Sequence, residues 1–108
     1  MEWSEFVRDT ARRPGMWVRR PYIDGLTSLW LGFSLGAADQ NFDAFSRWVR
    51  TDRFPVEGGY PNPLSLDGIV RGAITGAHDI ALTREQDDQA VALLIELLHE
   101  FEGETRAT

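Results

Sequence analysis

The stretch IDGLTSLWLGFSLGAAD, residues 23–39, decides the fold because it is apolar on more than one side of a helix. One apolar stripe follows helical spacing and a second lies beside it: Leu26, Leu29, Trp30, Phe33 and Ala37, then Leu31, Leu35 and Ala38. Gly32 and Gly36 are four residues apart and would leave a groove where a neighbouring helix backbone approaches closely. We therefore predict that residues 23–39 form the buried central helix of a small helical domain.

The rest of the chain supplies amphipathic segments that would pack around this helix. They are residues 4–12 with Ser4 as N-cap, 42–51 with Asn41 as N-cap, 66–76, and a last helix from the Thr83–Gln86 capping box to a C-cap at Gly103. The sequence thus predicts an all-α fold of about five helices. Residues 1–103 form one domain, and residues 104–108 are a frayed tail. An α+β alternative has short strands at 16–19 and 53–56.

A basic loop, RRPGMWVRRP at residues 12–21, connects the first two predicted helices around the Pro14-Gly15 turn signal. Met16, Trp17 and Val18 are available to plug the core. The loop carries four arginines: Arg12, Arg13, Arg19 and Arg20. Guanidinium groups suit phosphates and carboxylates, so these four are a candidate anion-binding site. The alternative is that they pair with the acidic C-terminal half and balance its charge.

Residues 52–64 form the longest predicted loop, with three prolines and two glycines. Long loops in compact domains are often functional, and Glu57, Tyr60 and Asn62 are suited to protein recognition. The alternative is a spacer that tucks Phe54 and Tyr60 onto the core.

The charge is uneven, and this points to a class of partner. Residues 1–56 hold eight arginines and seven acidic residues, a net charge of +1, whereas residues 57–108 hold three arginines and ten acidic residues, a net charge of −7. An acidic half disfavours nucleic acid or an anionic membrane as partner and favours a basic protein. The candidate contacts are Glu57, Asp79, Asp87 and Asp88. Asp87 and Asp88 are also explained as compensation of the dipole in the first turn of the last helix.

No constellation for catalysis or cofactor binding is recognisable. The chain has no cysteine, and its two histidines, His78 and His99, lack metal-ligand spacing such as HExxH. We therefore predict a protein that is not an enzyme and has no metal or cofactor. No apolar run reaches the roughly 18 residues of a membrane span, and the N-terminus is acidic, unlike a signal peptide, so the expected location is the cytoplasm.

A family resemblance rests on the segment from Arg13 to Trp17 before a helix bearing Leu29, Gly36 and Ala37. Phe45, Trp48, a glycine-rich loop and an acidic final helix follow it. This order resembles a group of small, mostly uncharacterised actinobacterial proteins with an RPGMY-type signature. Some such groups sit among the immunity-like proteins of toxin systems. Trp17 stands where tyrosine is usual, and Arg19-Arg20 replaces a small residue. The resemblance carries over no functional residue.

Three classes of function follow. The first is an acidic binding protein that occludes a basic partner, as an immunity protein does to a toxin. The second is a structural or self-associating module, which predicts an exposed apolar patch. The third is a binder of a small anionic ligand at the arginine-flanked loop.

Overall fold

The computed structural model describes residues 2–56, 58 and 62–107, which form an all-α fold. Its five α-helices are α1 (Trp3–Arg12), α2 (Tyr22–Gly36), α3 (Asn41–Trp48), α4 (Leu66–Thr75) and α5 (Arg84–Ala107). A 3-10 turn, η1 (Pro14–Met16), follows α1, and a π-helical turn, η2 (Val49–Arg53), continues α3. The described residues contain no strand, so the α+β alternative is wrong: Met16 lies in η1 and Arg53 in η2.

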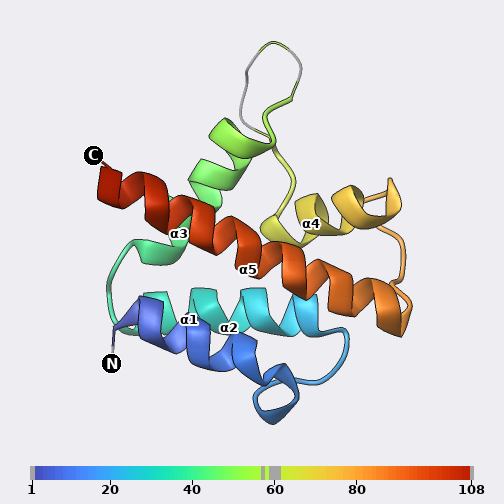
Figure 1. The fold of residues 1–108 in the computed structure, drawn as a ribbon, viewed down its shortest axis with the longest axis horizontal. Coiled ribbons are helices and arrows are strands. Elements are labelled where there is room, and N and C mark those ends of the chain that lie inside the picture. The colour runs from blue at the N-terminus through green and yellow to red at the C-terminus, as the bar shows by residue number, and fades with distance from the viewer. Residues whose placement is uncertain (1, 57, 59–61, 108) are drawn as a thin grey trace.

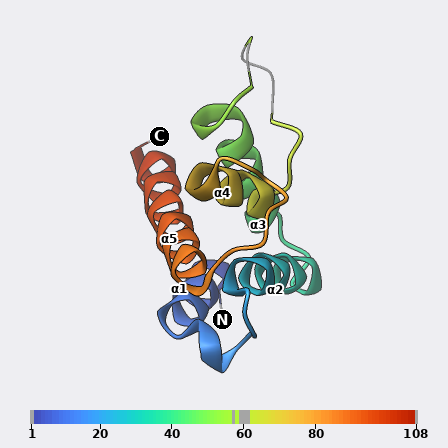
Figure 2. The same ribbon diagram turned by 90° about the vertical axis from the view of Figure 1, so that its right-hand side faces the viewer.

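Two helices share the centre of the fold, since α2 and α5 each contact all the other α-helices. In Figure 1, α5 runs across the molecule with α1 and α2 on one side and α4 on the other, and α3 passes behind it. Figure 2 shows the molecule turned by 90°, and in this view α4 lies between α5 and α3. The core therefore lies between the inner faces of α2 and α5.

The first predicted apolar stripe is buried in part: Leu26 and Trp30 are buried, Leu29 and Phe33 are partly buried, and Ala37 lies beyond α2 and is exposed. Ile23, Leu26 and Trp30 are completely buried. The indole N–H of Trp30 donates to Thr10 Oγ1 at 2.7 Å, and Trp3 packs edge-on against Trp30 with ring centroids 6.4 Å apart. Trp3 Nε1 also donates to Trp30 O at 3.4 Å, so this inner face joins α1 to α2 through aromatic packing and two buried hydrogen bonds.

The outer face of α2 corrects the prediction of a helix buried on most of its circumference. Leu31 is 41% exposed and Leu35 is 69% exposed. A Cβ built at Gly32 or Gly36 would meet no heavy atom within 4 Å, so no described helix packs into the groove predicted there. In a chain of this length the other helices cover one side of α2, because a small domain buries a limited share of its surface.

The two ends of α5 differ in how well local sequence predicts them. The capping box is confirmed: Gln86 N donates to Thr83 Oγ1 at 3.1 Å, and Thr83 N donates to Gln86 Oε1 at 3.0 Å. The predicted C-cap at Gly103 is wrong, because α5 continues to Ala107. In these last turns Glu102 pairs with Arg8 of α1, and Glu104, in the segment predicted to fray, accepts the indole N–H of Trp48 of α3.

The caps of the shorter helices are partly as predicted. Gly76 ends α4 with a left-handed φ of 84°, as expected. Ser4 and Asn41 lie inside α1 and α3 rather than before them, and Asn41 N donates to the Asp39 carboxylate at 3.0 Å. The N-cap of α4 is Ser65, whose hydroxyl accepts from Gly68 N at 3.4 Å.

Candidate binding surfaces

The structure divides the four arginines of the basic loop into one that is paired and three that form no ion pair with the described part of the chain. Arg20 reaches the start of α5, where its Nη1 lies 2.9 Å from Asp87 Oδ2 and its Nη2 lies 2.8 Å from Asp88 Oδ1. The hydrogen bond with Asp88 is the main cause that raises the pKa of Arg20. Arg20 therefore follows the charge-balancing alternative. It links the loop to Asp87 and Asp88, which lie 67 and 68 positions later in the chain.

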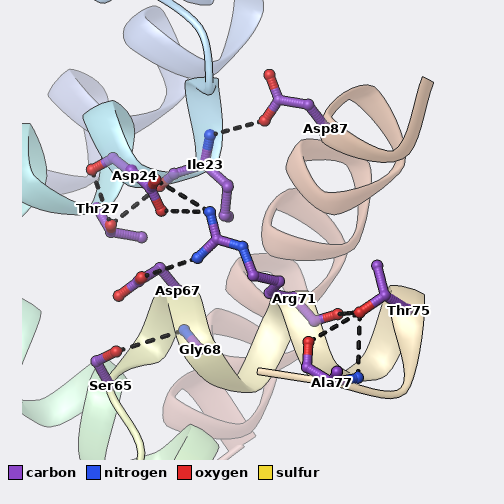
Figure 3. Close-up of polar contacts among 10 residues, drawn as sticks. All are labelled: Ile23, Asp24, Thr27, Ser65, Asp67, Gly68, Arg71, Thr75, Ala77 and Asp87. Carbon is purple, nitrogen blue, oxygen red and sulfur yellow. Dashed lines mark hydrogen bonds and ion pairs between the residues drawn. The ribbon is translucent and has the colours of Figure 1, made fainter. Parts of the chain in front are cut away.

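Asp87 is an internal structural residue rather than part of an exposed acidic surface. Its side chain is 2% exposed, and it accepts hydrogen bonds from the backbone N–H groups of Tyr22 at 2.8 Å and Ile23 at 3.1 Å. These are the first two residues of α2, so Asp87 satisfies donors that a helix N-terminus leaves free. The contact between Asp87 and Ile23 is drawn in Figure 3. The carboxylate is occupied within the chain.

A second ion-pair cluster ties α2 to α4 on the same side of the molecule. Arg71 Nη2 contacts both carboxylate oxygens of Asp24, at 2.9 and 3.0 Å, and Nη1 lies 3.4 Å from Asp67 (Figure 3). The hydrogen bond with Asp24 is the main cause that raises the pKa of Arg71. Because its charge is matched by two carboxylates, Arg71 acts as a bridge between helices.

An open cleft of about 570 Å³ lies beside these two clusters. It is lined by Arg20, Asp24, Arg71, Asp87 and the segment 79–84. Asp79 is exposed there, and the cleft brings it to the same side as Asp87. Most of the lining charges are already engaged in ion pairs, so the cleft offers little unmatched charge for a ligand.

The other three arginines surround an exposed apolar turn. Arg12, Arg13 and Arg19 are exposed, and none forms an ion pair with a described residue. Between them Met16 is 72% exposed and Trp17 is 49% exposed. We call these five residues the Arg–Trp face. Arg12, Arg13, Met16 and Trp17, with Asp9, line a cavity of about 330 Å³.

The expectation that Met16 and Trp17 plug the core is wrong, and the turn geometry gives the reason. Pro14 and Gly15 form the tight turn η1, which directs the following side chains outward. Only Val18 of the three packs against the core. Trp17 is held from one side by Phe6, with ring centroids 5.7 Å apart, and Phe6 stacks on Phe33 at 4.1 Å. The indole is therefore fixed in place while half of its surface stays accessible.

Of the four acidic candidates, only Asp88 lies on the exposed side of α5, where it joins acidic residues that the sequence analysis did not single out. Glu85, Asp88 and Glu96 are exposed at helical spacing, and Glu100 lies along the same side with its carboxylate 2.8 Å from Arg53 Nε. Asp88 shares Arg20 with Asp87 but remains 60% exposed. We call these four residues the acidic face.

The 52–64 loop is described only in part. Asn62 anchors it: Asn62 N donates to Arg50 O at 3.0 Å, its Nδ2 donates to Phe54 O at 3.1 Å, and its Oδ1 accepts from Leu64 N at 3.1 Å. Asn62 is therefore engaged in holding the loop. The other two candidates, Glu57 and Tyr60, lie outside the described residues.

The described residues contain no cluster of three or more His, Cys, Asp and Glu side chains that could hold a metal ion. None of the described helices is both long enough and apolar enough to span a bilayer. Comparison with protein-family models, curated proteins and solved structures found no match to this chain.

Proposed function

We propose that this protein is a non-enzymatic binding protein and that the Arg–Trp face docks an acidic protein partner. The observation that supports this most strongly is the exposure of Met16 and Trp17 among three arginines that form no ion pair with a described residue. The net charge of −6 makes a local excess of guanidinium groups a distinct feature of this surface. The proposed setting is the cytoplasm, which suits a chain without cysteine.

Each side chain of the Arg–Trp face would contribute to the free energy of binding a partner in a different way. Trp, Met and Arg are enriched in protein interfaces because they bury large areas and tolerate a polar rim. Trp17 is already ordered by Phe6, so its burial by a partner would cost little further conformational entropy. The guanidinium groups of Arg12, Arg13 and Arg19 would exchange bound water for carboxylates of the partner. These contacts would fix the orientation of the partner, and the opposite charges would speed its association.

A second candidate function uses the acidic face to occlude a basic partner, as the resemblance to immunity-like proteins implies. The observation in its favour is the row formed by Glu85, Asp88 and Glu96 along the exposed side of α5. Such a row would attract a basic surface at low ionic strength. This row contains no large exposed apolar side chain among the described residues, so it offers fewer groups for a stable contact than the Arg–Trp face.

One experiment separates the two candidates. The tagged protein is used to capture partners from a lysate of its own host, and two charge-reversal variants are compared with the wild type at equal salt. The Arg12→Glu/Arg13→Glu variant changes the Arg–Trp face, and the Glu85→Arg/Glu96→Arg variant is its matched control on the acidic face. We expect an acidic partner that is lost with the first variant and with Trp17→Ser but is kept by the second.

The opposite result, a basic partner lost only with Glu85→Arg/Glu96→Arg, would replace the first candidate by the second. A partner that both variants retain at moderate salt would contradict both candidates, because charged faces depend on ionic strength.

A further inference from the structure

The strongest unassigned surface is the outer face of α2 together with the groove beside α3. This outer groove has a volume of about 590 Å³, and its lining includes Leu31, Leu35, Ala38, Phe42, Asp43 and Arg47. Leu35 is among the most exposed large apolar side chains described, and Leu31 and Phe42 also line a neighbouring hollow. The described chain leaves this apolar strip uncovered from Leu31 to Leu35, about one turn of α2.

We propose that a second copy of this chain occupies the outer groove, with the two α2 helices crossing about a two-fold axis near Leu31 and Leu35. This self-association goes beyond the binding function above, because it uses a different surface from the Arg–Trp face. In a two-fold interface the same patch is buried on both copies, so its two ends must be complementary to each other.

The charges at the groove meet that requirement. Asp39 lies three residues beyond the last residue of α2, and Asp43 lies in the first turn of α3, so both line the groove toward the C-terminal end of α2. Arg47 lies one turn further along α3. A two-fold axis would reverse this order in the second copy and place Arg47 of one copy toward the acidic end of the other. A groove with both signs of charge suits its own copy better than a partner of one charge.

The ion pair already present within the chain does not oppose this exchange. Arg47 Nη2 lies 2.8 Å from Asp43 Oδ2, and the two side chains are 68% and 58% exposed. An exposed pair of this kind contributes little to stability, so Arg47 can turn to a carboxylate across the interface at small cost. The apolar contact would supply the attraction, and the charges would set the orientation.

The backbone of α2 allows a close crossing at this point. A Cβ at Gly32 or Gly36 would have nothing within 4 Å, so these two positions leave open space beside the exposed leucines. A second helix could therefore approach α2 more closely than it could beside larger side chains.

The first test is the mass of the protein in solution over a concentration series, measured by light scattering. We expect the wild type to rise from the mass of one chain toward that of two, and a Leu31→Ser/Leu35→Ser variant to stay at one chain throughout. Ile80→Ser is the matched control, because Ile80 is 50% exposed on the segment after α4 and should leave the rise unchanged. A wild type that stays at the mass of one chain, or an equal effect of Ile80→Ser, would overturn the proposal.

The second test reports on the geometry and does not depend on disrupting the surface. The chain has no cysteine, so a Leu35→Cys variant carries a single thiol. A two-fold axis close to this position brings the two thiols within reach, and mild oxidation should give a covalent dimer at a dilution where Ile80→Cys gives little. Equal rates of cross-linking in the two variants would contradict the proposed crossing.

A third variant tests whether a loss of association could be caused by unfolding of the chain. Gly32→Arg places a large side chain into the open space of the groove on both copies, so helix content should be preserved while association is lost. Association that survives Gly32→Arg would also contradict the proposed crossing. Because the Arg–Trp face is untouched in all these variants, partner capture through Trp17 should persist, and the two proposals fail separately.

Discussion

The two faces of α2 carry similar apolar residues and have opposite surroundings. Ile23, Leu26 and Trp30 lie in the core without exposed surface, whereas Leu31 and Leu35 face outward. The glycines differ in the same way: a Cβ at Gly25 would meet Val18 Cβ at 2.7 Å, and one at Gly32 would meet nothing. Apolar character therefore marks a contact surface, but the other helices of the chain cover only one of the two surfaces here.

The largest expected effect concerns the buried aromatic of the inner face. Trp30→Ala should destabilise the fold by about 3–5 kcal/mol, because it leaves a cavity and removes the partner of Thr10. Leu35→Ala, on the outer face, should change the stability of the single chain by less than about 0.5 kcal/mol. Chemical denaturation at low protein concentration measures both, and similar losses in the two variants would remove the distinction between the faces.

Two neighbouring carboxylates near the start of α5, one buried and one exposed, allow the same comparison for polar side chains. Asp87→Ala should cost about 1–3 kcal/mol, because the N–H groups of Tyr22 and Ile23 lose a buried acceptor. Its neighbour Asp88 is the control: it is exposed, so Asp88→Ala should cost less than about 1 kcal/mol. Equal midpoints in urea for the two variants would show that Asp87 does not cap α2.

Replacement of glycine by alanine should change the stability of the fold in opposite directions on the two faces of α2. Gly25→Ala should destabilise by about 1–3 kcal/mol, since the Val18 Cβ lies close to the backbone and cannot rotate away. Gly32→Ala should stabilise the single chain by up to about 1 kcal/mol, because alanine favours the helix and meets no neighbour. Thermal unfolding compares the pair, and a lower Tm for Gly32→Ala would mean that the outer face is covered.

The smallest effect is expected at the C-terminal end of α2 and depends on pH. Hydrogen bonds from Ser34 Oγ and then from Asn41 N hold the pKa of Asp39 below its ordinary value of 3.8. A lowered pKa in the folded state stabilises the fold above pH 3.8 and loses that contribution as the pH falls through the folded value. Asp39→Asn should therefore lose less stability than the wild type when denaturation is repeated at acidic pH. Identical pH dependence would show that this carboxylate is not linked to folding.

Local signals predicted many of the helices and some of their ends. The capping box of Thr83 and Gln86 and the end of α4 near Gly76 depend on residues within a few positions, and both are confirmed. The end of α5 was not predictable from Gly103, since Trp48 and Arg8 contact the turns around and beyond it from other helices. Short-range rules fail where a contact between distant residues decides the outcome.

The candidate surfaces were predictable in residue type but not in arrangement. The sequence placed four arginines around one turn, yet nothing local distinguishes Arg20, which pairs with Asp87, from Arg13, which pairs with no described residue. Exposure of Met16 and Trp17 was missed because apolar residues near a turn are equally compatible with the core. The one available signal was their position between a Pro-Gly turn and paired arginines on both sides.

The sequence by itself determined the all-α class, the apolar stripes and the absence of any cysteine chemistry, because helical periodicity and composition are properties of the chain alone. Only the tertiary structure decided which stripe of α2 is covered and which arginines are balanced. These outcomes depend on where α2 and α5 lie relative to each other, through contacts such as Arg20 with Asp87 across 67 positions of the chain.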